Sequence, residues 1–106
     1  PGLPATVAAK LRASRVVVVS LYAGTVAGDR EAVTVMRAGA RSAGANFVAV
    51  NLLDEKQARQ MQTFAGEVTT PTLLVVKRPG KVTTKIEGVV DQAVVAQAAH
   101  DAGARK

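Results

Sequence analysis

Apolar side chains follow two kinds of pattern in successive segments of the chain, one typical of strands and one typical of helices. Residues 15–22 hold four consecutive valines and then a Leu-Tyr pair, the pattern of a central strand covered on both faces. Residues 47–53, 72–76 and 82–87 predict three more strands, because each is a short run rich in β-branched, aromatic or other apolar residues. We therefore expect four strands.

Helical spacing separates these strands. Apolar residues recur three or four positions apart in residues 4–13 and 29–43, between Asp54 and Gly66, and after Asp91. The stripes expected to face the core are Val7, Ala8 and Leu11; Val33, Met36, Ala40 and Ala43; Ala58, Met61, Phe64 and Ala65; and Val94, Val95, Ala98 and Ala99. Asp54 and the glutamine three residues later predict a capping box, and Asp91 predicts a second N-cap.

The resulting order is α-β-α-β-α-β-β-α. Strand–helix–strand units favour right-handed crossovers and parallel pairing. Pro79-Gly80 predicts a type II turn that joins the last two strands into an antiparallel hairpin. We expect one α/β domain over residues 1–106, with a central mixed four-stranded sheet, helices on both faces, and frayed ends at residues 1–3 and 103–106.

Composition excludes several kinds of site. The 106 residues include no cysteine and a single histidine, His100. Disulfides, thiolate nucleophiles, iron–sulfur clusters and cysteine-based zinc sites are therefore excluded, and we expect neither a metal nor a cofactor. Aromatic residues make up 3% of the chain, which argues against a stacking platform for single-stranded nucleic acid.

The chain is basic, with a formal net charge of +6. Such a charge admits an acidic partner, although basic residues spread along a chain also arise from general composition. The longest purely apolar run, residues 16–19, is far shorter than a membrane span. We expect a soluble segment, either cytoplasmic or extracytoplasmic after removal of a signal or a membrane anchor.

Three motifs together resemble the thioredoxin fold family. Residues 69–77 place Thr69, Thr70 and Pro71 directly before an apolar strand, and a later glycine, Gly88, follows the hairpin. Residues 18–23 resemble the strand and aromatic-Ala pair that lead into that family's active site, and residues 50–54 resemble its next strand with a terminal Asp. The resemblance covers essentially the whole chain. It implies a thioredoxin-like domain with a cis peptide bond before Pro71.

The resemblance also locates the family's active site, and its reactive groups are missing here. The Cys-x-x-Cys positions fall on residues 26–29, with Val26 at the first cysteine and Asp29 at the second. Thr25 replaces the usual tryptophan, and Ser20 replaces the buried acid that assists proton transfer. Thiol–disulfide exchange needs a thiolate, so the resemblance implies a redox-inactive member and not an enzyme.

The family's substrate groove is expected to remain. In that family the residue before the cis-proline, here Thr70, pairs its backbone with an extended peptide. The expected groove residues are Tyr22, Thr25, Val26, Thr69, Thr70, Pro71 and Gly88. We expect a protein- or peptide-binding module.

Several alternatives stay open. In the first, the groove binds nothing. In the second, the chain is a glutathione-type transferase that uses Tyr22, or another enzyme that needs no thiol. In a third it is a structural module that associates with itself or belongs to a larger or membrane-tethered protein.

Other polar residues have both a structural and a functional interpretation. Asp29 either stabilises its helix or accepts an amide from a partner, and His100 suits a helix C-terminus. The hairpin residues Lys77, Arg78, Lys81 and Lys85 either protect a sheet edge or contact an acidic partner or anionic lipid. The acidic neighbours Glu87 with Asp91 and Asp54 with Glu55 have no supporting cleft residues for hydrolysis.

Overall fold

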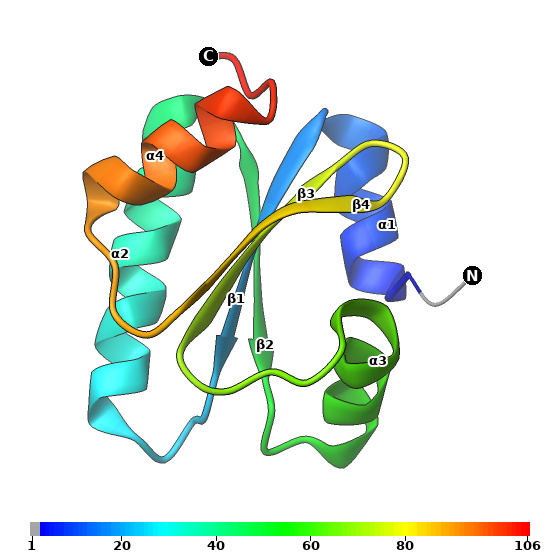
Figure 1. The fold of residues 1–106 in the computed structure, drawn as a ribbon, viewed down its shortest axis with the longest axis vertical. Helices are drawn as coiled ribbons and strands as arrows, with labels where there is room; N and C mark the ends of the chain where they lie inside the picture. The colour runs from blue at the N-terminus through cyan, green and yellow to red at the C-terminus, as the bar shows by residue number, and fades with distance from the viewer. Residues whose placement is uncertain (1–2) are drawn as a thin grey trace.

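The computed structural model describes residues 3–106 and confirms the expected order of elements (Figure 1). The helices and strands are α1 (Ala5–Ala13), β1 (Val16–Tyr22), α2 (Ala27–Ala43), β2 (Asn46–Asn51), α3 (Glu55–Ala65), β3 (Thr72–Lys77), β4 (Lys81–Glu87) and α4 (Gln92–Asp101). Helix α2 begins two residues before the predicted position, and β2 ends two residues before it.

The strands form one mixed sheet in the order β2-β1-β3-β4. Strand β1 pairs parallel with β2 and antiparallel with β3, and β4 pairs antiparallel with β3. Parallel pairing is thus correct for the unit containing α2 and wrong for the unit containing α3. The reason is visible in Figure 1: α3 lies near the end of the sheet where β2 stops, so β3 starts at that end and runs back.

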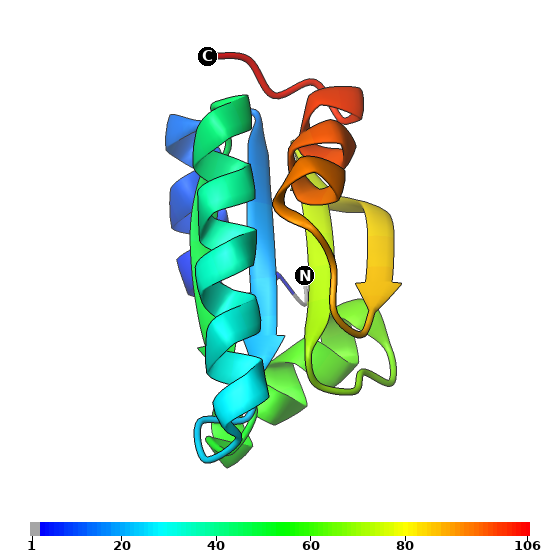
Figure 2. The same ribbon diagram turned by 90° about the vertical axis from the view of Figure 1, so that its left-hand side faces the viewer.

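Helices cover both faces of the sheet, as expected: in Figure 1, α2 and α4 lie on one side of the strands and α1 and α3 on the other, and Figure 2 looks onto the α2/α4 side. Helices α2 and α4 enclose one core, and α1 and α3 enclose the other. The first core includes Val16, Val18, Met36, Leu73, Val75, Val95 and Ala99, and the second includes Val7, Leu11, Val17, Val19, Met61, Leu74 and Val76. Because neighbouring residues of β1 and β3 point to opposite faces, these two central strands supply both cores.

The β3–β4 hairpin departs from the predicted geometry at two positions. Gly80 N–H donates to Lys77 O at 2.8 Å, so Pro79 is the third residue of the turn, and its peptide bond is cis. This is a type VI turn rather than the predicted type II turn. Further along, Val75 pairs with Thr84 and Val76 with Val82, which leaves Thr83 as a bulge whose Oγ1 donates to Val75 O at 3.3 Å.

The helix caps at Asp54 and Asp91 match their sequence-based predictions only in part. Asp54 accepts the amides of Lys56 and Gln57, but its own N–H donates to Asn51 O, so the capping box is half formed. Asp91 occupies the N-cap of α4 without a side-chain cap hydrogen bond. In the stripe of α4, Val95 and Ala99 are buried and Ala98 is partly buried. Val94 is 45% exposed because it lies on the outer side of the helix.

The C-terminal segment that was expected to fray is packed in part, although Arg105 and Lys106 are exposed. Ala104 is buried in the α2/α4 core, and its N–H donates to Ala99 O at 3.0 Å. Gly44 ends α2 at φ 78°, and the backbone of Arg105 lies so close that a Cβ at Gly44 would overlap it. Leu3 also packs against the α1/α3 core, whereas residues 1–2 lie outside the described part of the chain.

Candidate functional site

One end of the sheet collects the residues that the sequence predicted for a binding groove. Strands β1, β2 and β4 finish at this end and β3 begins there (Figure 1). Leu21 pairs with Thr72, which places Tyr22 beside Pro71, and Gly88 N–H donates to Pro71 O at 2.8 Å. The predicted residues therefore come from three neighbouring strand ends and from the start of α2.

Three side chains fix the loop between β1 and α2. Ala23 N–H donates to Asp29 Oδ2 at 2.9 Å, and Gly24 N–H donates to Asn51 Oδ1 at 3.1 Å. Arg30 Nη1 donates to Gly24 O at 2.9 Å. This loop is therefore held by hydrogen bonds to α2 and to the end of β2.

Asn51 is a site residue that the sequence reasoning missed. Its Oδ1 also accepts Leu53 N–H at 3.1 Å, the local Asx pattern that ends β2. An asparagine at a strand end, followed by the helix-capping Asp54, is a signal for this turn. Its second role, the bond to Gly24, joins residues 27 positions apart and has no local signature.

Asp29, which the resemblance aligns with the second cysteine of thioredoxins, has a structural role in this chain. Asp29 is 4% exposed, and its Oδ2 accepts a hydrogen bond from the backbone N–H of Ala23 in the same chain. The predicted partner amide is therefore supplied internally. The carboxylate stabilises the loop as well as the first turn of α2.

The other two positions that the resemblance aligns with the active site of thioredoxins, Val26 and Ser20, carry no thiol or carboxyl group. Val26 is the N-cap of α2, is 47% exposed and makes no side-chain cap hydrogen bond. Ser20 is fully buried in β1, and its Oγ has no hydrogen-bond partner. A valine and an isolated serine hydroxyl provide neither a thiolate nor a proton-transferring acid.

Thr70 leaves its backbone available at this end of the sheet. The Thr70–Pro71 peptide bond is cis, and the preceding turn is fixed by Thr72 Oγ1, which donates to Thr69 O at 2.7 Å. Within residues 3–106, neither the N–H nor the C=O of Thr70 forms a hydrogen bond. Thr70 is partly buried, and both of its backbone groups lack a hydrogen-bond partner within the described chain.

Exposed apolar side chains lie at the same end of the sheet as Thr70. The large hydrophobic residues exposed in the described chain are Val26, Leu53, Val89 and Val94, at 47%, 53%, 84% and 45%. The first three follow the ends of β1, β2 and β4 at the same end of the sheet. At about 4.8 Å per strand spacing, the strand ends of β2 and β4 lie roughly 14 Å apart. We call the area of Val26, Leu53, Thr70 and Val89 the sheet-end surface.

Among the predicted groove residues, Thr69 borders a cavity of about 310 Å³ beside α3, together with Leu52 and Val68. Tyr22 and Gly88 are partly buried, and Thr25 is exposed. The sheet-end surface is thus an exposed apolar area rather than an enclosed pocket.

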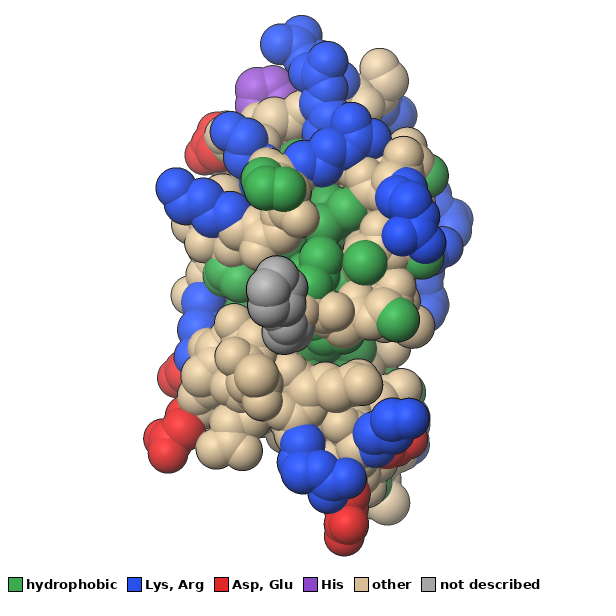
Figure 3. Space-filling model, turned by 90° about the vertical axis from the view of Figure 1, so that its right-hand side faces the viewer, with side chains coloured by type: hydrophobic (Ala, Val, Ile, Leu, Met, Phe, Trp, Pro, Cys, Tyr) green, Lys and Arg blue, Asp and Glu red, His purple; other side chains and the backbone are tan. Residues whose placement is uncertain are grey.

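Other candidate groups have mainly structural contacts. Arg78 donates from Nε to Leu11 O at 2.7 Å and from Nη2 to Arg12 O at 3.3 Å, and Lys85 donates to Glu67 O. Half of the predicted basic cluster at the hairpin is therefore engaged within the chain. On the face shown in Figure 3, basic side chains lie around the periphery and apolar ones occupy the centre.

The single histidine does not belong to a metal cluster. His100 lies in the last turn of α4, where its Nδ1 is 4.0 Å from Asp101 Oδ1, and both side chains are exposed. Over residues 3–106, no group of three or more His, Asp or Glu side chains has the arrangement of a metal site. None of the helices described above is long and apolar enough to cross a bilayer.

Comparison with solved structures identifies the fold. A mutant thioredoxin from Halobacterium salinarum NRC-1 matches with a TM-score of 0.75 at 14% identity, covering 89% of this chain and 80% of that one. The oxidised thioredoxin from Plasmodium falciparum matches with a TM-score of 0.71 at 14% identity, covering 98% and 96%. A thioredoxin from Fasciola hepatica gives 0.64 at 17% identity, covering 83% and 81%. No family model and no curated protein sequence matches the chain.

Proposed function

We propose that this chain, whose thioredoxin-like fold and lack of cysteine are consistent with a redox-inactive domain, is a binding module that holds an extended, apolar segment of another protein on the sheet-end surface. The observation that carries the proposal is the unpaired backbone of Thr70 among the exposed side chains of Val26, Leu53 and Val89.

Each part of this surface supplies a different element of recognition. The N–H and C=O of Thr70 pair with the backbone of an extended segment, as a strand pairs with a sheet edge. The exposed valines and leucine bury apolar side chains of that segment, each buried methylene contributing about 0.8 kcal/mol. The anchored loop at Ala23 and Gly24 keeps Val26 in place, so little ordering accompanies binding.

A neutral ten-residue peptide of alternating Leu and Ser tests the proposal. Its titration should shift the backbone amide resonances of Thr70 and Val89 in a saturable manner. Val89→Asp should weaken binding about tenfold or more, because it places a charge in the apolar contact. Val94→Asp is the matched control, since Val94 is exposed on α4.

A bulky replacement, Thr70→Trp, provides the second variant of the same test. It should weaken binding by covering the free backbone while unfolding at a similar denaturant concentration. Equal weakening by Val89→Asp and Val94→Asp, or no saturable shift at Thr70, would contradict the proposal.

The enzyme alternative has its own measurement. An insulin-reduction assay with dithiothreitol should proceed at the background rate, because the chain offers no thiolate. Titration with glutathione should leave the amide resonance of Tyr22 unchanged. A saturable shift there would favour the transferase alternative.

A further inference from the structure

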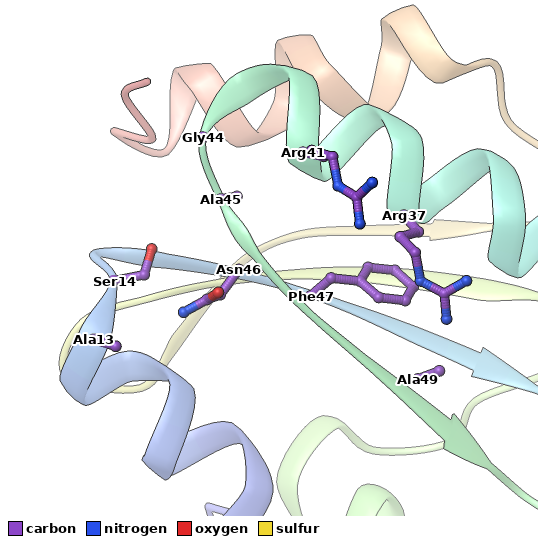
Figure 4. Close-up of a pocket in the computed structure, with 9 residues that line it drawn as sticks. All are labelled: Ala13, Ser14, Arg37, Arg41, Gly44, Ala45, Asn46, Phe47 and Ala49. Atoms are coloured by element: carbon purple, nitrogen blue, oxygen red, sulfur yellow. The ribbon is translucent and has the colours of Figure 1, made fainter.

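A cavity of about 610 Å³ lies on the outer side of β2, away from the sheet-end surface (Figure 4). Strand β2 forms its floor with Asn46, Phe47 and Ala49, and α2 overhangs it with Arg37 and Arg41. The C-terminal end of α1 closes one side. The cavity is open to solvent and follows the edge of the sheet.

The backbone of β2 is unpaired on this side. Within residues 3–106, strand β2 lies at the edge of the sheet and pairs only with β1. Leu52 N–H donates to Tyr22 O at 2.8 Å, which fixes the phase of this parallel ladder. In a strand the N–H and C=O of one residue point to the same side, and those of the next residue point to the other side. Since Leu52 and every second residue before it face β1, the N–H and C=O of Phe47 and Ala49 point outward. Two donors and two acceptors therefore face the cavity.

The charge above this edge is wholly positive. Arg37 lies over the Phe47 ring at 5.1 Å from its centroid, and Arg41 extends from α2 toward the strand (Figure 4). None of the described residues that line the cavity is acidic. Within residues 3–106 the one ion pair joins His100 and Asp101, so neither arginine has a carboxylate partner.

We propose that this edge binds an extended acidic peptide, which adds to β2 as a further strand. The outward groups of Phe47 and Ala49 pair with the peptide backbone. Carboxylates at alternate positions of the peptide then lie on the α2 side, where Arg37 and Arg41 bind them. The inference is independent of the sheet-end surface, because it uses different strands and the opposite chemistry.

The same observations disfavour two other occupants. A second copy of this chain would bring Arg37 and Arg41 of both copies together at one edge, and each copy carries a net charge of +6. A nucleic acid has no peptide backbone that could pair with the outward donors and acceptors of β2. The Arg37 guanidinium also covers the Phe47 ring, on which a base would otherwise stack.

An eight-residue peptide of alternating Glu and Thr is the probe, and the same peptide with Lys in place of Glu is its control. Binding should protect the amides of Phe47 and Ala49 from hydrogen exchange and weaken as salt is added. Arg41→Ala should raise the dissociation constant about tenfold. Arg59→Ala, the same charge change on α3, should leave it unchanged.

Ala49→Pro separates strand addition from simple charge attraction. The substitution removes an outward N–H, and proline is tolerated where an edge strand faces solvent. We expect Ala49→Pro to abolish binding of the Glu-Thr peptide while the chain stays folded and Thr70→Trp leaves that binding intact.

Unchanged binding to Ala49→Pro, or equal binding of an eight-nucleotide single strand, would overturn the proposal in favour of a general polyanion surface. Loss of the Arg41 effect would overturn the charge argument. A concentration-dependent dimer removed by Ala49→Pro would assign the edge to a second copy instead.

Discussion

Ser20 places a hydroxyl in a part of β1 that offers it no hydrogen-bond partner. Its neighbours across the sheet are Ala49 and Leu73, and the other β1 residues on its face, Val16 and Val18, belong to the α2/α4 core. A buried hydroxyl without a partner lowers stability by about 1–3 kcal/mol relative to its hydrated state. By the resemblance described above, this position holds an acid in active thioredoxin-like proteins. In this chain the serine at the same position lowers the free energy of unfolding.

Ser20→Ala should raise the free energy of unfolding by about 1 kcal/mol, because it removes the unsatisfied oxygen and leaves only a small void. Chemical denaturation measures the change. Ser14→Ala is the control, since Ser14 Oγ donates to Val16 O at 3.0 Å, and it should lower stability by about 1 kcal/mol. If Ser20→Ala destabilises as much as Ser14→Ala, the Ser20 hydroxyl has a partner in solution.

At the scale of elements, helix α2 contains two glycines in opposite surroundings. A Cβ built on Gly39 would lie 2.6 Å from Val95 Cβ and 2.8 Å from Gln92 O. A Cβ on Gly28 would meet nothing within 4 Å. Gly39 therefore sets how closely α4 approaches α2, whereas Gly28 has no such role.

Gly39→Ala should lower the free energy of unfolding by about 1–3 kcal/mol, because α4 must move away from α2. Gly28→Ala in the same helix should raise it by about 0.4–1 kcal/mol, because alanine restricts the unfolded chain. Thermal unfolding of both variants checks the prediction. Changes of the same sign would show that the contact with Val95 does not limit the helix crossing.

The sequence predicted the elements well because their signals are local. The valine run of β1 and the α2 stripe of Val33, Met36 and Ala40 each follow one period and are buried as expected. Strand β4 shows the limit of this reasoning. Simple alternation puts Val82 and Ile86 on one face, but the bulge at Thr83 sends Val82 to the α1/α3 core and Ile86 to the α2/α4 core.

The candidate site was less predictable because its contacts are non-local. Proximity to Pro71 could be argued from the resemblance, and the strand ends place those residues together. The exposure of Leu53 and Val89 depends on where β2 and β4 stop, which the apolar pattern alone does not fix. The role of Asn51 depends on a contact with Gly24 across 27 positions.

At the scale of the whole molecule, the sheet separates two cores that share no helix. Val7 of α1 is buried on one side, and Val95 of α4 is buried on the other. Side chains on opposite faces of a sheet do not touch. Each core should therefore respond independently to loss of volume, although the molecule unfolds as one unit.

Val7→Ala and Val95→Ala should each lower the free energy of unfolding by about 2 kcal/mol, from lost burial and the remaining void. The double variant should lose the sum to within about 0.5 kcal/mol, because the sites have no shared contacts. Denaturant unfolding of the three variants measures this. A larger deviation would mean that strain passes through the sheet.

The extra residue Thr83 also bears on how the molecule would first open. Because Val82 and Ile86 seal different sides of the sheet, peeling β4 away from β3 would admit water to both interiors in a single event. Amide protons beneath α1 and those beneath α4 would then exchange at a common rate when this edge lifts. One extra residue in a short edge strand thus makes β4 part of both cores, so that a single local opening exposes the two cores together.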